Sequence, residues 1–214
     1  MNDTCKIAEI EINLYKSAKD AASQILNSFI INRKFLSAVA MNPEKVVSLY
    51  DSPELKRIIS NFNIKYVDGS GLAFLIGQKI YKKVPRIAGC DLWEELMVES
   101  GKRKLKVFLI GADLDTLRKT EKKLRDIYKV DIVDTMDGFS HSEDEFIDRL
   151  KKVKPDIVSV ALGSPKQEKF INLCKINQID SVFMGVGGTY DVFIGKKVRA
   201  SKEMQSYGLE WFHR

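Results

Sequence analysis

The sequence predicts an α/β protein in which helices flank a Rossmann-like, mostly parallel sheet within a single compact domain. Apolar runs and helical stretches alternate through the second half of the chain, as they do in βαβ units. The segment 155–162 is almost wholly apolar, which is typical of a strand buried on both faces. The 214 residues contain no repeat, linker or low-complexity segment that would divide them.

The first half of the chain is less regular than the second. Strands are expected at residues 10–14, 35–41 and 64–67, and helices at residues 18–30, 71–81 and 91–100. The second strand ends at Asn42-Pro43, where Asn42 can cap a helix and Pro43 can occupy its first turn. Asp68-Gly69, a common turn pair, closes the third strand.

The second half predicts four more strands with helices between them. The strands are expected at residues 106–110, 131–134, 155–162 and 181–184, with helices at residues 114–128 and 165–175. A further helix begins after Ser142, because Glu145 three residues on completes a capping box.

Charge and composition limit the classes of function. With 35 basic and 29 acidic residues the net charge is +6, which suits a phosphate-bearing ligand or an anionic membrane surface, although solvated helix faces explain any single cluster. No nucleic-acid-binding motif is present, so no nucleic acid partner is expected. The N-terminus lacks a secretory h-region and no window approaches the roughly 20 apolar residues of a membrane span, so we expect a cytoplasmic protein.

Cysteine and histidine are too sparse for a disulfide framework or a zinc site. Cys5, Cys90 and Cys174 are scattered without CxxC spacing, which favours a reducing compartment. His141 and His213 are the two histidines, so we expect no zinc site.

Candidate ligand residues follow the predicted strands, because ligands of open α/β sheets bind at the carboxyl ends of the strands. These positions are mostly glycine, carboxylate or amide, which suits a phosphorylated, hydroxyl-rich ligand. They are Asn42, Asp68-Gly69, Gly111, Gly138, Gly163-Ser164 and residues 185–191.

Gly111 opens a turn into a helix, where backbone N–H groups can hold a phosphate. The GxGxxG fingerprint of dinucleotide binding is absent. Asp113 and Asp115 form a DxD tripeptide like the one that holds a metal-diphosphate in many glycosyltransferases. We favour the simpler interpretation that Asp113 caps the helix.

Two further turns have both structural and functional interpretations. Ser164 as cap and Gln167 at the third helical position predict a capping box, while Lys166 or Gln167 could also bond a sugar or diphosphate. The segment 185–191 holds three glycines in four residues and ends in Tyr190-Asp191. It is a tight turn or, as we favour, a ligand loop in which Asp191 accepts bonds from sugar hydroxyls.

Asp68 is the candidate for acid-base chemistry, which needs a partly buried carboxylate close to the reacting hydroxyl. Because Asp-Gly is a standard turn pair, the residue type alone favours a turn aspartate.

Together these segments resemble the WecG/TagA/CpsF family of bacterial glycosyltransferases, in one collinear match from about Ala40 to the end. Any one segment is unspecific, but their order and spacing are not. The matching segments are residues 40–43, 67–69, 86–92, 108–111, 155–157, 163–168, 185–188 with Asp191, Gly195 with Arg199-Ala200, and 208–214.

The resemblance implies an inverting hexosyltransferase that needs neither a metal ion nor another cofactor. Its donor would be a UDP-sugar, typically of N-acetylmannosamine or its uronic acid, and its acceptor an undecaprenyl-diphosphate-linked sugar. The products would feed wall teichoic acid, enterobacterial common antigen or other surface polysaccharides. The enzyme would work peripherally at the inner face of the cell membrane, and self-association into a homo-oligomer is compatible with the resemblance.

The resemblance also implies roles for single residues. Asp68 would be the general base, and Asn42, Arg86 and Gln167 match pocket positions, to which we add Lys166. The nucleotide-sugar would contact Gly111, Gly187, Gly188, Tyr190 and Asp191. Residues 1–100 would form the acceptor and catalytic half of one glycosyltransferase domain, and residues 101–214 the nucleotide-sugar half.

The chain departs from the family pattern in three places. Ala40 stands where the family usually has Thr, which implies a different sugar or weaker activity. Ser201 stands where it often has Pro, which should matter little. The sequence ends at Arg214, where family members commonly continue with a basic tail that touches the membrane and supplies arginines, so part of the catalytic apparatus is expected to be missing.

Two alternatives stay open. The first is a non-catalytic nucleotide- or sugar-binding domain. It is disfavoured by the joint presence of the four matching site residues Asp68, Asn42, Arg86 and Gln167. The second is a flavodoxin-like or dehydrogenase domain, which the missing GxGxxG disfavours.

Overall fold

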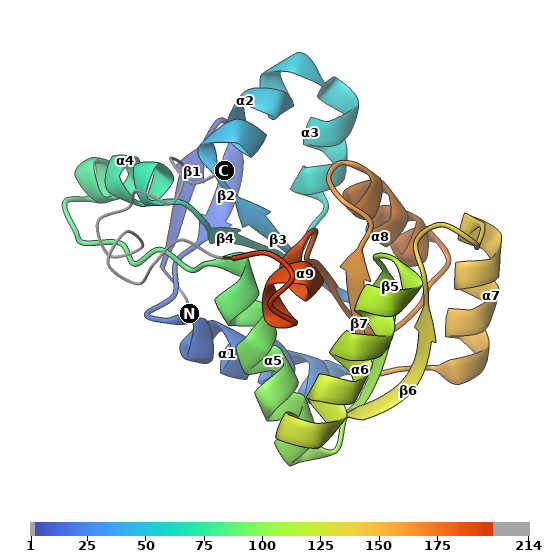
Figure 1. Ribbon diagram of the computed structural model, residues 1–214. Coiled ribbons are helices and arrows are strands. Elements are labelled where there is room, and N and C mark those ends of the chain that lie inside the picture. The colour runs from blue at the N-terminus through green and yellow to red at the C-terminus, as the bar shows by residue number, and fades with distance from the viewer. Residues whose placement is uncertain (1–2, 199–214) are drawn as a thin grey trace.

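The computed structural model describes residues 3–198, and in this part of the chain helices cover both faces of an eight-stranded sheet (Figure 1). The strand order is β1-β2-β4-β3-β8-β7-β5-β6. Only β1 and β2 pair antiparallel, and every other neighbouring pair is parallel. The predicted fold class, a Rossmann-like and mostly parallel sheet in one compact domain, is confirmed.

The strands are β1 (Thr4–Ile7), β2 (Ile10–Asn13), β3 (Leu36–Met41), β4 (Ile64–Val67), β5 (Lys106–Gly111), β6 (Asp131–Met136), β7 (Ile157–Ala161) and β8 (Val182–Gly185). The helices are α1 (Ala18–Asn32), α2 (Pro43–Asp51), α3 (Pro53–Ser60), α4 (Ser70–Ile80), α5 (Gly89–Arg103), α6 (Leu114–Tyr128), α7 (Glu143–Val153), α8 (Lys166–Ile176) and α9 (Thr189–Phe193). All predicted elements are present, and β1, α3 and α9 are additional to them.

Three predicted helix caps are confirmed. Asn42 Oδ1 accepts the Lys45 backbone N–H at 2.7 Å, and Asp113 Oδ1 accepts that of Thr116 at 2.9 Å. Ser142 and Glu145 form the capping box that their spacing predicts. Each cap satisfies a backbone donor that the first helical turn leaves without a partner, so residues within one turn are enough to mark the start of these three helices.

Two apolar layers hold the sheet between the helices. Alternate residues of one strand enter different layers, as the two-residue repeat of a strand requires. Ala38 and Tyr66 pack with α1 and α5 on one face, whereas Val39 and Val67 pack with α3, α4 and α8 on the other. Among residues 3–198 no helix combines the length and apolar character of a membrane span.

The matches at Arg199-Ala200, Ser201 and residues 208–214 lie outside the described residues, as does His213.

Candidate active site

A cleft of about 1030 Å³ lies at the carboxyl edge of four adjacent strands, β4, β3, β8 and β7. Six of the predicted site residues line it: Asn42, Asp68, Arg86, Gln167, Gly187 and Gly188. They meet because neighbouring parallel strands end at the same edge of a sheet. The lining residues form two groups, 40–90 and 164–198, so both predicted halves of the chain contribute a wall.

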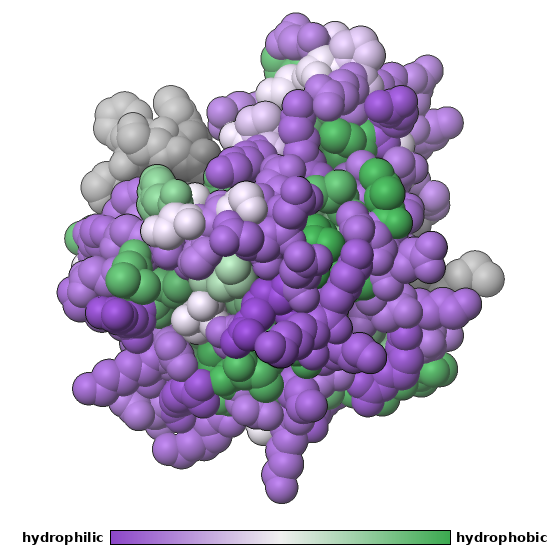
Figure 2. Space-filling view, turned by 90° about the vertical axis from the view of Figure 1, so that its right-hand side faces the viewer, coloured by the Kyte–Doolittle hydropathy of each residue, from purple (hydrophilic) through white to green (hydrophobic). Residues whose placement is uncertain are grey.

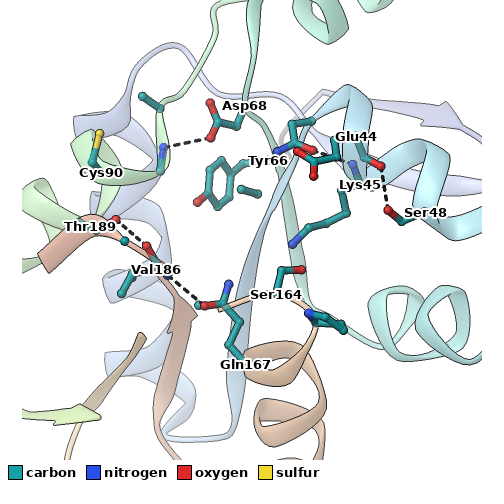
Figure 3. Close-up of a pocket in the computed structure, with 18 of the residues that line it drawn as sticks. Glu44, Lys45, Ser48, Tyr66, Asp68, Cys90, Ser164, Gln167, Val186 and Thr189 are labelled. Atoms are coloured by element: carbon teal, nitrogen blue, oxygen red, sulfur yellow. Dashed lines mark hydrogen bonds between the residues drawn. The ribbon is translucent and has the colours of Figure 1, made fainter. Parts of the chain in front are cut away.

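Asp68 lies at the end of β4, where its carboxylate accepts a backbone hydrogen bond (Figure 3). The Gly89 N–H donates to Oδ2 at 3.4 Å, and Arg86 Nε lies 3.4 Å from Oδ1. The Asp68 and Arg86 side chains are 20% and 19% exposed, so both reach the cleft while remaining mostly packed. A carboxylate beside a guanidinium in a partly enclosed cleft can accept a proton from a bound hydroxyl.

Asn42 lies against the Asp68 turn because α2 and α4 follow the ends of two neighbouring parallel strands, β3 and β4. Gly69 has φ +95°, a conformation that side chains rarely adopt, and a Cβ on it would lie 3.3 Å from Pro43 Cδ and 3.8 Å from Asn42 Cβ. The close packing at Gly69 therefore holds the start of α2, with Asn42, against the turn that follows Asp68.

The predicted capping box at Ser164 is wrong. The first residue of α8 is Lys166, Pro165 takes the cap position, and no side chain bonds the first turn. The Gln167 side chain instead accepts the Gly187 N–H at 3.0 Å, and a Cβ on Gly185 would lie 2.7 Å from Gln167 Nε2. Gln167 therefore braces the glycine loop after β8, and the absence of a side chain at Gly185 makes room for it.

Gly111 lies outside the cleft. It is buried with φ +102°, and a Cβ there would lie 2.3 Å from the Ala161 carbonyl oxygen. The glycine is therefore required by the close approach of β5 to the end of β7. At this turn the Ala112 N–H donates to the Ala161 carbonyl at 3.1 Å, so one of the N–H groups of the predicted phosphate site is already bonded within the protein. Asp113, two residues on, caps α6.

Tyr190 is a core residue. Its ring packs against Trp93 at 5.6 Å between centroids, and its hydroxyl donates to the Ser159 carbonyl at 3.0 Å. Burial raises the pKa of the hydroxyl above its usual range. The side chain is 1% exposed, so the expected contact with a nucleotide-sugar is not available to it in this structure.

Asp191 and Lys166 also lie outside the residues that line the cleft. Asp191 pairs with Lys197 at 3.1 Å and with Lys196 at 3.6 Å, near Asp113. Hydrogen bonds from Lys196 and from the Thr116 N–H hold the pKa of Asp113 well below its usual range. Lys166 is exposed at the start of α8.

The ion pair of Lys45 and Glu168 was not predicted from the sequence. The Lys45 ammonium donates to Glu168 Oε1, and the two side chains are 10% and 1% exposed. Gln167 Nε2 donates to the same oxygen at 3.3 Å. Lys45 lines the cleft from α2 and Glu168 lies behind it on α8, so the pair joins the two helices at the site.

Tyr66 was also missed as a residue of the cleft. Figure 3 shows its ring between the carboxylate of Asp68 and the amide of Gln167. The hydroxyl is fully buried and finds no hydrogen-bond partner among the residues that the structure describes. Burial, and then the charge of Asp68, raise the pKa of this hydroxyl well above its usual range, so the phenol stays neutral.

Because a buried hydroxyl without a partner lowers stability, Tyr66→Phe is expected to raise the free energy of unfolding by about 1 kcal/mol. Tyr190→Phe is the matched control, since it removes an equally buried hydroxyl that does have a partner, and it should lower the same quantity by about 1 kcal/mol. Urea denaturation measures both. Equal destabilisation by the two changes would show that the Tyr66 hydroxyl has a partner in solution.

The open parallel sheet, with a carboxylate, a guanidinium, an amide and a glycine loop around one cleft at its carboxyl edge, defines an α/β protein that binds a polar ligand there. A family model described as Glycosyl transferase WecG/TagA/CpsF family matches residues 5–214. The chain belongs to this family, which supports a role in glycosyl transfer between a sugar donor and an acceptor.

Proposed function

We propose that this chain is an inverting glycosyltransferase that moves N-acetylmannosamine or a related sugar from UDP to an undecaprenyl-diphosphate-linked sugar. The product would enter cell-surface polysaccharide or teichoic acid synthesis. The observation that carries the proposal is the position of Asp68, whose carboxylate lies beside Arg86 in a cleft that Asn42 also lines and that the glycine loop after β8 closes on its other side.

The proposed reaction is a single displacement. Asp68 takes the proton of the acceptor hydroxyl, and the resulting oxygen bonds to the anomeric carbon from the face opposite UDP. The bond between that carbon and the diphosphate oxygen breaks, and its electron pair leaves with UDP. Because the attack comes from the opposite face, the anomeric configuration inverts.

Basic side chains around the cleft support a diphosphate leaving group, since charge-assisted hydrogen bonds stabilise developing negative charge. Arg86, Lys169 and Lys197 line the cleft together with Lys45. The walls suggest that residues before about 100 hold the acceptor and the base, and that residues after it hold the donor.

The two carboxylates of the DxD tripeptide are engaged within the protein, which supports transfer without a metal ion. Asp113 bonds Lys196 at 2.8 Å as well as its helix cap partner, and Asp115 pairs with Lys119 at 2.6 Å. Each of the two carboxylates therefore already has a lysine partner within the protein. Work at the inner membrane face follows from the lipid-linked acceptor, and self-association stays a prediction.

A UDP-release assay tests the proposal. Purified protein would receive a panel of UDP-sugars with a short-chain polyprenyl-diphosphate-GlcNAc acceptor, in the presence and absence of EDTA. We expect acceptor-dependent release with one donor, unaffected by EDTA. Measurable UDP binding without release from any donor would favour the alternative, a non-catalytic nucleotide-sugar-binding domain. Release that EDTA abolishes would refute the metal-independent mechanism.

A further inference from the structure

The outer face of α4 exposes large apolar side chains. Phe74 and Leu75 are 65% and 60% exposed, and Tyr81 after the helix is 94% exposed. The inner face already buries Leu72, Ala73 and Ile76 against the sheet. A helix needs only one apolar stripe to pack on a core. The apolar residues of the outer face are therefore additional to what the fold uses.

The same segment carries basic charge with no acidic residue. Between Asp68 and Asp91 the sequence contains Lys79, Lys82, Lys83 and Arg86 and no Asp or Glu. The three lysines are exposed. From the neighbouring β1 side, the Lys6 carbonyl accepts from Lys79 at 2.6 Å, and Asp3 lies 3.4 Å from Lys82 with both side chains mostly exposed. Such an exposed pair is weak, so the segment keeps a positive field.

This surface lies next to the candidate active site. α4 begins two residues after Asp68, and its 11 residues extend about 16 Å from there. A shallow groove beside the helix is lined by Phe74, Tyr81, Lys82 and Lys83 and also by Arg86, which faces the cleft as well. A ligand held at this surface would therefore be within reach of Asp68.

The opposite end of the sheet has a different surface. Figure 1 shows α4 at one end of the molecule and α7 at the other. The face at the α7 end, turned to the viewer in Figure 2, is mostly hydrophilic, with apolar residues in small separate patches. Exposed apolar residues together with exposed lysines are thus found at the α4 end, on the side of the molecule away from that face.

We infer that Phe74, Leu75, Tyr81, Lys79, Lys82 and Lys83, which we name the α4 surface, dock on a membrane that contains anionic lipid. Apolar and aromatic side chains enter the interface at headgroup level while lysines meet lipid phosphates. The value of this docking for catalysis rests on the proposed function, because it would bring the Asp68 cleft to a lipid-linked acceptor. The docking itself does not depend on activity.

A second copy of the chain is a poorer occupant of this surface. A twofold contact would place the same patch on both subunits. The lysines of one α4 surface would then face those of the other, and like charges across an interface are unfavourable. An anionic lipid surface is complementary to the same lysines.

Vesicle flotation of the full 214-residue chain tests the inference, with phosphatidylcholine vesicles that contain or lack phosphatidylglycerol. The protein should float only with the anionic vesicles, and less at high salt. Lys82→Glu with Lys83→Glu should lower the partition coefficient about 25-fold or more, since each lysine near such a surface contributes about fivefold. Phe74→Ser with Leu75→Ser should weaken flotation at all salt concentrations.

Matched controls change the same chemistry elsewhere. Lys151→Glu with Lys152→Glu makes the same change in net charge on the exposed side of α7, and Val47→Ser with Tyr50→Ser removes exposed apolar residues from α2. Both should float like the unchanged protein. Flotation that the α4 variants retain, or that all charge reversals lower equally, would overturn the inference. So would a dimer in solution that only the α4 variants dissociate.

A transfer assay separates this inference from the proposed function. The α4 variants should transfer sugar normally to a short-chain acceptor in solution but poorly to a long-chain acceptor in anionic vesicles. If no variant and no unchanged protein shows transfer, the proposed function fails while flotation still decides the docking. If the α4 variants lose transfer to both acceptors equally and still float like the unchanged protein, the α4 surface acts on the cleft and not on the membrane, and the inference is wrong.

Discussion

Asp68→Asn is expected to abolish sugar transfer while leaving UDP binding nearly unchanged. The amide has almost the shape of the carboxylate but cannot take the proton of the acceptor hydroxyl, and general base catalysis contributes roughly 10²- to 10⁴-fold to a rate. The donor nucleotide is expected to bind on the other wall of the cleft, around residues 164–198, so its affinity should survive. Steady-state UDP release and calorimetric titration with UDP measure the two quantities.

Asp113→Asn provides the control for this change. It makes the same chemical replacement at an aspartate outside the cleft, and asparagine caps helices about as well as aspartate. Turnover by this variant should stay close to that of the unchanged enzyme. Comparable turnover by the Asp68 and Asp113 variants would remove Asp68 from the role of general base.

Lys45→Ala is expected to lower the free energy of unfolding by about 3–5 kcal/mol, because it leaves the Glu168 carboxylate buried without its cation. Glu168 is 1% exposed and its Oε2 finds no hydrogen-bond partner among the described residues. The neutral Gln167 amide, which donates to Oε1 at 3.3 Å, does not replace the lost positive charge. Urea denaturation followed by circular dichroism measures the change. Glu168→Gln in the Lys45→Ala background should recover much of the loss, since it removes the uncompensated charge.

Lys169→Ala is the matched control, because Lys169 forms an ion pair with Glu54 from the same helix α8 that holds Glu168. That pair is about half exposed on both sides, and solvent-screened pairs contribute about 1 kcal/mol or less. Similar losses from Lys45→Ala and Lys169→Ala would contradict the burial of the Lys45 pair in solution.

Local chemistry explains which elements could be predicted. The caps at Asn42, Asp113 and Ser142 depend on residues within one helical turn, so their signal is contained in a short stretch of sequence. The hairpin of β1 and β2 lacks such a signal. Its turn residues Ala8 and Glu9 have φ +48° and +66°, where glycine or asparagine is usual. This conformation runs against the local preference of these residues, and β1 was accordingly missed.

The site shows the same division between local and distant causes. Asn42, Asp68 and Gly187 were predicted because each lies within two residues of the end of a strand, and parallel strands bring such positions to one edge. Gln167 and Tyr190 could not be placed in this way. The Gln167 side chain accepts the N–H of Gly187, 20 residues away in the sequence. The Tyr190 side chain packs inward and donates to the carbonyl of Ser159, 31 residues away.

The sequence by itself therefore determined the fold class, the family and the edge of the sheet at which the cleft opens, since these depend on periodicity, strand order and residues next to strand ends. Only the tertiary structure decided which strand-end residues reach the cleft. It also paired Lys45 with Glu168, buried the Tyr66 hydroxyl and left the apolar residues of α4 exposed. The physical reason is that burial and ion pairing depend on groups more than a hundred residues apart, such as Lys45 and Glu168, and no local pattern records which of them will meet.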